Sequence, residues 1–352
     1  MAPTILIAAG GTAGHVVPAL AVADALRADG ARVVFAGGER AEAELVPAAG
    51  YELRRLDVAG LSRTNPLKAA RAGLKAARAL RTSLSLLGEL RPDAVLGGGG
   101  YVAGPVGAAA VLRRVPLVLA EADSHLGLSN RLLAPFARRV CLAFPVEGRA
   151  GGKYLVTGRP VPPPATDRAA ARARFGIAEG ETCVLVFGGS LGARSINEAA
   201  VEAFAGARFR VLHAAGSRDY ASLRERVAGR ERYDLREYIQ PFGEALLASD
   251  LCVARAGGSV FEIAAHGRPS LLVPYPHAAG DHQTANARWL ERAGAAVVVP
   301  DGELTPERLA HEVAALLHDG SRLEAMGRAA AALARPDAAQ AIADAVLEAA
   351  RA

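Results

Sequence analysis

The chain has 352 residues, 51% of them hydrophobic and 22% charged, which predicts two globular domains and excludes collagen-like, low-complexity and disordered classes. Its net charge of +5 is uneven, because residues 1–157 hold 19 Lys and Arg against 12 Asp and Glu, whereas residues 158–352 hold 22 against 24. A basic first half favours an anionic partner, which is a nucleic acid, a membrane surface or an anionic substrate.

Short β-branched runs alternate with helical stretches through the first half. Strands are predicted at residues 3–9, 31–38, 93–99, 116–123 and 139–144, with helices at 18–30 and 41–49. This alternation predicts a parallel sheet covered by helices on both faces. The longest uncharged stretch, residues 94–112, contains six glycines and a proline, so a strand, a loop and a helix start are expected there instead of a membrane span.

A proline-rich stretch at residues 158–167 interrupts the pattern, which then restarts. Further strands are predicted at 182–190, 210–216, 235–241, 250–258, 269–275 and 295–300. The fold class is therefore α/β, with two Rossmann-like domains (1–157 and 158–337) whose parallel sheets are expected to face each other across a deep cleft. A helix over 338–352 is expected to pack back on the first domain.

The three cysteines and the N-terminus indicate a reducing cytoplasm. Cys141, Cys183 and Cys252 sit singly in apolar runs, a pattern that excludes a disulfide framework and a CxxC metal site. No basic region precedes the first apolar run, which is expected to be a strand and not a signal peptide.

Ligands of parallel sheets bind where strands end, so the loops that follow strands are the candidate site. The loop Gly10–His15 has the glycines typical of anion binding at a helix start, but not the GxGxxG spacing of a dinucleotide fold. His15 is expected just before a helix with Pro18 in its first turn, where the helix dipole favours a neutral imidazole that can accept a proton. Alternatively, His15 only bonds the local backbone. A second glycine loop, residues 97–105, has four consecutive glycines before Tyr101, which indicates special backbone angles or close approach to a partner. Alternatively, Tyr101 only plugs this loop.

Two carboxylates lie at the end of the strand predicted at 116–123. Glu121 and Asp123 superficially resemble a divalent metal pair, but without further ligands nearby a metal site is disfavoured. Binding of a sugar hydroxyl, or capping of the next helix, fits these two residues better.

Three loops of the second half also carry residues suited to binding phosphate or sugar hydroxyls. Gly188–Arg194 is a second anion loop with Ser190 as hydroxyl donor. Ser259 and Glu262 form either a capping box or a ribose contact, two readings that spacing alone leaves open. The loop from His277 to Asn286 offers amides such as Gln283, which suit sugar hydroxyls because they both donate and accept.

The order of these loops along the chain, together with the run at residues 45–63, resembles that of the GT-B glycosyltransferases. They closely resemble the peptidoglycan family that transfers GlcNAc from UDP-GlcNAc to lipid I, undecaprenyl-pyrophosphoryl-MurNAc-pentapeptide. The resemblance implies an inverting transfer with UDP-GlcNAc as substrate, no cofactor and no obligatory metal. His15 and Tyr101 would lie on the acceptor side, and the general base would be His15, or else Glu121 or Asp123.

The resemblance also implies the donor contacts. Glu262 would hold the ribose, Ile239 the uracil, and Gln283 and Asn286 the GlcNAc hydroxyls. Asp123 stands where the family often has Asn, and Arg159 could replace a positive charge that is lost where this chain has Pro162. The other implied contacts are Thr12, Ala13, Gly14, Ser190, Gly258 and Ser259.

A lipid-borne acceptor implies peripheral attachment to the cytoplasmic face of the bacterial membrane. Four basic residues recur at helical spacing beside two leucines, a pattern that suits anionic lipid headgroups or, alternatively, an ordinary solvated helix face. These residues are Leu67, Lys68, Arg71, Leu74, Lys75 and Arg78. Other cell-wall synthesis proteins are possible partners, while nucleic acid is disfavoured because aromatic–basic interleaving and a helix-turn-helix signal are absent. Two rival functions stay open, a UDP-GlcNAc 2-epimerase and a non-catalytic, membrane-recruiting glycosyltransferase subunit.

Overall fold

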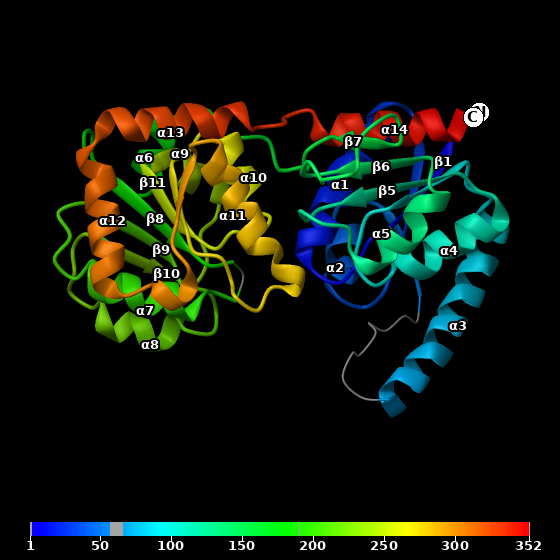
Figure 1. Ribbon diagram of the computed structural model, residues 1–352, viewed down its shortest axis with the longest axis horizontal. Helices are drawn as coiled ribbons and strands as arrows, with labels where there is room; N and C mark the ends of the chain where they lie inside the picture. Colours follow the sequence, from blue (N-terminus) through cyan, green and yellow to red (C-terminus); the bar gives the residue numbers. More distant parts are fainter. Residues whose placement is uncertain (1, 57–65, 190, 352) are drawn as a thin grey trace. The chain divides into compact units, whose positions relative to one another are not determined.

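The computed structural model describes residues 2–56, 66–189 and 191–351. The chain divides into two compact units, the first made of Met1–Val161 and Arg335–Ala352 and the second of Pro162–Ala334. Each unit contains one parallel sheet with helices on both faces, so the predicted α/β class with two parallel sheets is confirmed (Figure 1).

The sheet of the first unit has seven strands in the order β3-β2-β1-β4-β5-β6-β7. The strands are β1 (Thr4–Ala8), β2 (Arg32–Gly37), β3 (Glu52–Arg55), β4 (Ala94–Gly97), β5 (Leu117–Glu121), β6 (Arg139–Leu142) and β7 (Tyr154–Val156). The helices are α1 (Ala13–Ala28), α2 (Ala41–Ala48), α3 (Pro66–Leu90), α4 (Ala103–Arg113), α5 (Leu128–Leu133) and α14 (Ala338–Arg351).

Alternate residues of β1 pack in two different hydrophobic clusters, one on each face of the sheet. Ile5 and Ile7 pack in a cluster with α1, α2 and α14, whereas Leu6 and Ala8 pack with α3, α4 and α5. Successive side chains of a strand point to opposite faces, and here both faces are covered. This double coverage explains why the strand is a continuous apolar run and not an alternating one.

The second unit has a six-stranded parallel sheet in the order β10-β9-β8-β11-β12-β13. The strands are β8 (Cys183–Phe187), β9 (Arg210–Ala214), β10 (Tyr233–Arg236), β11 (Leu251–Ala254), β12 (Ser270–Leu272) and β13 (Ala296–Val298). The helices are α6 (Arg168–Arg174), α7 (Arg194–Ala203), α8 (Tyr220–Arg226), α9 (Phe242–Ala248), α10 (Val260–Ala265), α11 (His282–Arg292), α12 (Pro306–His318) and α13 (Gly320–Ala332).

Both sheets reverse their strand order once, between β1 and β4 in the first and between β8 and β11 in the second. At such a point the two following loops leave in opposite directions, which opens a crevice at the carboxyl edge of the sheet. The four loops concerned are the glycine-rich loops singled out from the sequence. The topology therefore places a candidate half-site on each unit.

Some boundaries differ from the sequence prediction. β3 and β7 were not predicted, and β10 ends at Arg236 although the apolar alternation continues to Ile239. The neighbouring β9 ends at Ala214 and turns at Gly216, where φ is +77°, so the edge strand has no partner beyond Glu237. The three cysteines are buried and free, as predicted.

Helix α14 completes the core of the first unit. It packs against α1, β4, β5 and β6, and its buried face includes Ile342, Val346 and Leu347 (Figure 1). These side chains belong to the same cluster as Ile5 and Ile7 of β1. Residues from the two ends of the chain thus share one hydrophobic core.

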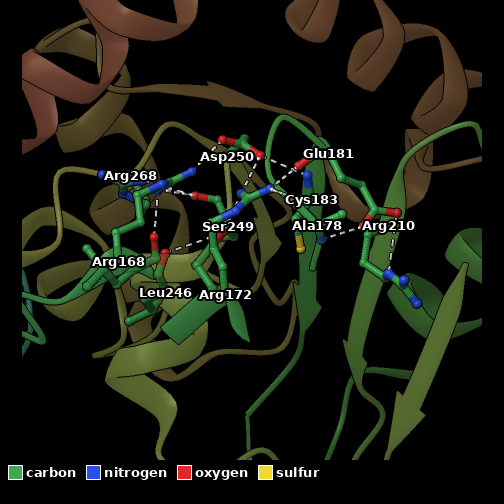
Figure 2. A network of polar contacts seen from close by, with 12 residues as sticks. Arg168, Arg172, Ala178, Glu181, Cys183, Arg210, Leu246, Ser249, Asp250 and Arg268 are labelled. Atoms are coloured by element: carbon green, nitrogen blue, oxygen red, sulfur yellow. Dashed lines mark hydrogen bonds and ion pairs between the residues drawn. The ribbon is translucent and has the colours of Figure 1, made fainter. Parts of the chain in front are cut away.

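An arginine-rich network closes the amino edge of the second sheet (Figure 2). The Asp250 carboxylate accepts the Cys183 backbone N–H at 2.8 Å and an Arg168 guanidinium N–H at 2.6 Å. Arg168 and Arg268 both donate to the Ser249 carbonyl, at 3.1 and 3.0 Å. The network ties α6 to the first residue of β8 and to the two residues just before β11, at the end of the sheet opposite to the candidate half-site.

No helix in the described ranges combines the length and apolar character needed to cross a bilayer.

Candidate functional site

The loops after β1 and β4 pack directly on each other in the first unit. A Cβ on Gly100, where φ is +76°, would lie 1.8 Å from the Gly10 carbonyl oxygen, so only glycine fits there. The Gly98 N–H donates to the Ala8 carbonyl at 2.9 Å. Part of the four-glycine run therefore serves loop-to-loop packing, which leaves little room for side chains at this edge.

His15 lies in the first turn of α1 and faces the second glycine loop. A Cβ on Gly99 would approach the imidazole Cδ2 to 2.7 Å, and the Thr12 hydroxyl lies 3.4 Å from Nδ1. Burial and then the Arg159 charge lower the pKa of His15, against smaller opposing effects of Asp123 and Glu42. At neutral pH the imidazole is therefore uncharged and able to accept a proton.

The predicted start of this helix was wrong, because α1 begins at Ala13 and Pro18 lies beyond its first turn. Proline has no N–H, so Pro18 leaves the Gly14 carbonyl without its helical donor. The Arg159 guanidinium donates to that carbonyl at 2.6 Å. One residue thus replaces the missing helical hydrogen bond and places a positive charge beside His15.

The Glu121 carboxylate organises the loop between β5 and α5. One oxygen accepts the Asp123 N–H at 3.1 Å, and the other accepts the Gly127 N–H at 2.8 Å and the Asn130 amide at 2.9 Å. Burial raises the pKa of Glu121, although these three hydrogen bonds oppose the rise. Gly127 precedes α5, so the carboxylate contacts the start of the next helix, in line with the capping alternative.

A cavity of about 680 Å³ opens between these groups within the first unit, a volume in the range of small-molecule sites. His15, Tyr101, Glu121 and Asp123 line its polar side. Its other walls are apolar side chains of α3, α4 and α5, including Leu80, Leu128, Leu132 and Leu133. This arrangement suits a ligand with a polar reacting end and an apolar remainder.

Two residues of this half-site were missed from the sequence. Glu42 is fully buried and bonds Gly11, Gly38 and Tyr101, although its position in the first turn of α2 looks like an ordinary helix-start acid. Asn130 follows Glu121 and Asp123 in the chain but was not distinguished from its neighbours. No local pattern separates either residue from a surface polar residue.

The second unit presents its loops in the same way. A Cβ on Gly192, where φ is +75°, would lie 1.9 Å from the Ala215 carbonyl, so the loops after β8 and β9 pack closely. α7 begins at Arg194, immediately after this loop. Ser190 lies outside the described residues, so its predicted phosphate contact stays a prediction.

Donor-contact candidates gather around the loop after β11. The Asn286 amide donates to the Ala256 carbonyl at 3.0 Å, and the Gln283 amide lies 3.7 Å from where a Cβ on Gly257 would be. Ser259 has helical φ and ψ and makes no capping hydrogen bond through its side chain, so the capping-box alternative is wrong for this residue. Glu262 is half-buried in the first turn of α10, and Gly258 precedes that helix.

Not every predicted contact is accessible. Asn286 is only 1% exposed, and its Oδ1 has no hydrogen-bond partner. Ile239 follows β10 and is 4% exposed. Thr12, Ala13 and Gly14 are exposed at the start of α1.

The predicted basic stripe belongs to α3. Arg78 is exposed, while the side chains of Leu67, Lys68, Arg71, Leu74 and Lys75 lie outside the described residues. The described part of the chain contains no group of three or more His, Cys, Asp or Glu side chains placed to hold a metal ion.

Known proteins resemble this chain over most of its length. Models of the glycosyltransferase family 28 N-terminal and C-terminal domains match residues 5–142 and 183–342. A Nitrosococcus oceani protein is 44% identical over 99% of both chains, and its name is UDP-N-acetylglucosamine--N-acetylmuramyl-(pentapeptide) pyrophosphoryl-undecaprenol N-acetylglucosamine transferase.

Solved structures give the same result. Acinetobacter baumannii MurG has a TM-score of 0.81 and 30% identity, with 99% of this chain and 100% of that chain covered. A UDP-GlcNAc 2-epimerase from Neisseria meningitidis has a TM-score of 0.67 at 13% identity, covering 98% of this chain and 100% of its own. The likeness to the epimerase is one of fold alone.

Proposed function

The chain belongs to glycosyltransferase family 28, and on that premise we propose that it transfers GlcNAc from UDP-GlcNAc to the 4-hydroxyl of MurNAc in lipid I, which yields lipid II for peptidoglycan synthesis. The observation that carries the proposal is the 44% identity over 99% of both chains to a transferase whose name states that donor and acceptor. The assignment of the acceptor to the first unit and of the donor to the second rests on the two half-sites.

The first unit holds the acceptor. Its cavity of about 680 Å³ combines His15, Glu121 and Asp123 with apolar walls on α4 and α5, which suits a sugar attached to a lipid. Arg159 and the first turn of α1 offer positive charge to a pyrophosphate.

The second unit holds UDP-GlcNAc. The loop Gly188–Gly192 and the first turn of α7 present backbone N–H groups to the diphosphate, with Ser190 as a further donor. Glu262 accepts hydrogen bonds from the ribose hydroxyls, and Ile239 contacts the uracil through its backbone. Gln283 contacts the GlcNAc hydroxyls, and the Asn286 amide supports the neighbouring loop through Ala256.

The transfer inverts the anomeric centre in one displacement. The MurNAc 4-oxygen bonds to C1 of GlcNAc while the bond from C1 to the UDP oxygen breaks, and the 4-hydroxyl proton moves to His15. The electron pair of the broken bond leaves with UDP, whose charge the helix start and loop N–H groups stabilise. His15 fits the role of base better than Glu121, because both Glu121 oxygens already accept hydrogen bonds from the loop.

Purified protein with UDP-GlcNAc and a short-chain lipid I analogue should release UDP only when the acceptor is present. The product mass should rise by one GlcNAc residue. Coupled UDP detection and mass spectrometry measure both quantities. UDP release without acceptor would indicate epimerase or hydrolase chemistry, and UDP-GlcNAc binding without turnover would indicate a non-catalytic subunit.

The protein reaches its lipid acceptor as a peripheral protein on the anionic cytoplasmic face of the membrane. The four basic residues of α3 recur at helical spacing, and Leu128, Leu132 and Phe136 on and just after α5 are exposed by 44%, 63% and 65%. A basic helix face attracts anionic headgroups, and exposed apolar side chains insert into the headgroup region of a bilayer. Other cell-wall enzymes on that face are candidate partners.

Reversing the four α3 charges should weaken binding to phosphatidylglycerol vesicles by roughly two to three orders of magnitude, at about 1 kcal/mol for each basic residue. Vesicle sedimentation measures the effect, and UDP binding should not change. The matched control reverses four exposed arginines of the second unit, Arg208, Arg224, Arg292 and Arg322. Equal vesicle binding by the α3 variant and the unaltered protein would exclude this surface.

A further inference from the structure

The carboxylate of Glu42 joins three loops of the first unit. Glu42 is fully buried in the first turn of α2. Its oxygens accept the Gly11 N–H at 2.8 Å, the Gly38 N–H at 2.9 Å and the Tyr101 hydroxyl at 2.6 Å. These donors follow β1, β2 and β4, which are neighbours in the sheet, so one side chain ties together three adjacent strand ends.

Three glycines make room for this side chain. A Cβ on Gly37 would lie 2.7 Å from the Glu42 Cγ, and one on Gly10 would lie 2.9 Å from its Oε1. A Cβ on Gly38 would lie 2.1 Å from the Tyr101 hydroxyl oxygen. The space at this edge is therefore shaped around the Glu42–Tyr101 pair, a constraint that phosphate binding alone does not explain.

Glu42 carries its charge although it is buried. Burial by itself would raise the pKa of Glu42, but the Tyr101, Gly11 and Gly38 hydrogen bonds lower it below its ordinary value. Burial and then the contact with Glu42 raise the pKa of Tyr101 to about 12. The Tyr101 hydroxyl thus stays protonated and donates to Glu42. The Tyr101 ring lies against Gly11, where a Cβ would be 3.5 Å from the ring Cδ1.

We propose that Glu42 is a positioning residue for the reaction: through Tyr101 and Gly11 it sets the wall of the acceptor cavity and the turn that leads into α1. The inference rests on the proposed function, because it concerns the same acceptor site. Gly11 directly precedes Thr12, which begins the turn that carries His15. Moving either contact shifts the imidazole relative to the acceptor hydroxyl, and misplacement by about 1 Å can cost about 100-fold in rate.

Replacing Glu42 with Gln tests the inference by kinetics. A glutamine has one accepting oxygen, so it cannot satisfy the donors on both sides, and kcat should fall about 10- to 100-fold. The KM for UDP-GlcNAc should stay within about twofold of that of the unaltered protein, because the second unit binds the donor. The matched control is Glu44→Gln, on the same helix but exposed, which should retain full turnover.

A second variant keeps the test decisive if Glu42→Gln folds poorly. In Gly38→Ala the new Cβ would lie 2.1 Å from the Tyr101 hydroxyl oxygen and 3.1 Å from the Glu42 Oε1, so it displaces chiefly the hydroxyl, and kcat should fall. Adding Tyr101→Phe removes the clashing hydroxyl and should restore part of that loss, which general destabilisation would not predict. Thermal unfolding midpoints are measured alongside.

The outcomes separate this inference from the proposed function. If the unaltered protein shows no acceptor-dependent turnover, the proposed function fails. If the unaltered protein turns over and Glu42→Gln keeps kcat within about twofold, the positioning role is wrong. The positioning role is also wrong if Tyr101→Phe alone abolishes turnover while Glu42→Gln does not, because the Tyr101 hydroxyl itself would then be the essential group.

Discussion

Replacing His15 with Ala should lower kcat by about 100- to 10,000-fold, the range expected when a general base is removed. The reason is geometric and electrostatic. The imidazole lines the acceptor cavity and packs over Gly99, and burial together with Arg159 keeps it uncharged at neutral pH. Acceptor-dependent UDP release at saturating substrates measures the loss.

The pH profile distinguishes His15 from the alternative base Glu121. A base works in its unprotonated form, so activity falls as pH drops through the pKa of His15, which lies below the ordinary 6.5. Arg159→Gln removes a positive charge that disfavours protonation, so the pKa should rise and the acidic limb should move to higher pH. A limb that stays in place in Arg159→Gln would remove His15 from this role.

The control for His15 is a second histidine. His311 is exposed on α12 of the second unit, and His311→Ala should leave kcat unchanged. Binding of UDP-GlcNAc, measured by calorimetry, should be the same in His15→Ala and in the unaltered protein. A His15 variant with near-normal kcat would transfer the base role to Glu121 or Asp123.

Placing a charge in the buried face of α14 should unfold the first unit selectively. Val346 is 0% exposed, and Val346→Asp would bury an unpaired carboxylate at a cost of about 3–5 kcal/mol. For a domain of this size that cost lowers the melting temperature by roughly 6–20 °C. Differential scanning calorimetry should show the first unit melting early, with UDP binding by the second unit retained.

An exposed position on the same helix provides the comparison. Asp344 lies on the solvent face of α14, and Asp344→Ala should melt within about 2 °C of the unaltered protein. If the melting temperature of Val346→Asp also stayed within about 2 °C of that of the unaltered protein, α14 would not be part of the core of the first unit.

The sequence predicts those features that neighbouring residues encode. In β1 and in β8 the apolar run and the glycines that follow it are only a few positions apart in the chain. The α/β class and the strand-end loops were therefore recognised. The strand order then places those loops at the two reversal points.

Features that depend on distant residues were not predicted. Glu42 meets Gly11 and Tyr101 from 31 and 59 positions away, and nothing near it in the chain distinguishes it from the exposed Glu44. The start of α1 was missed for a similar reason. A proline is expected near the first turn of a helix, and Pro18 is tolerated further in because Arg159, 145 positions from Gly14, supplies the missing donor.

The divided makeup of the first unit sets an order for folding during synthesis. Its core needs α14, which the ribosome makes only after all of Pro162–Ala334. The second unit can close its own core first, although domains are usually completed from the amino end. Until residues 338–351 emerge, the apolar face formed by α1 and the first sheet stays open to chaperones and proteases, so a translation product that stops short of them would be removed and not accumulate.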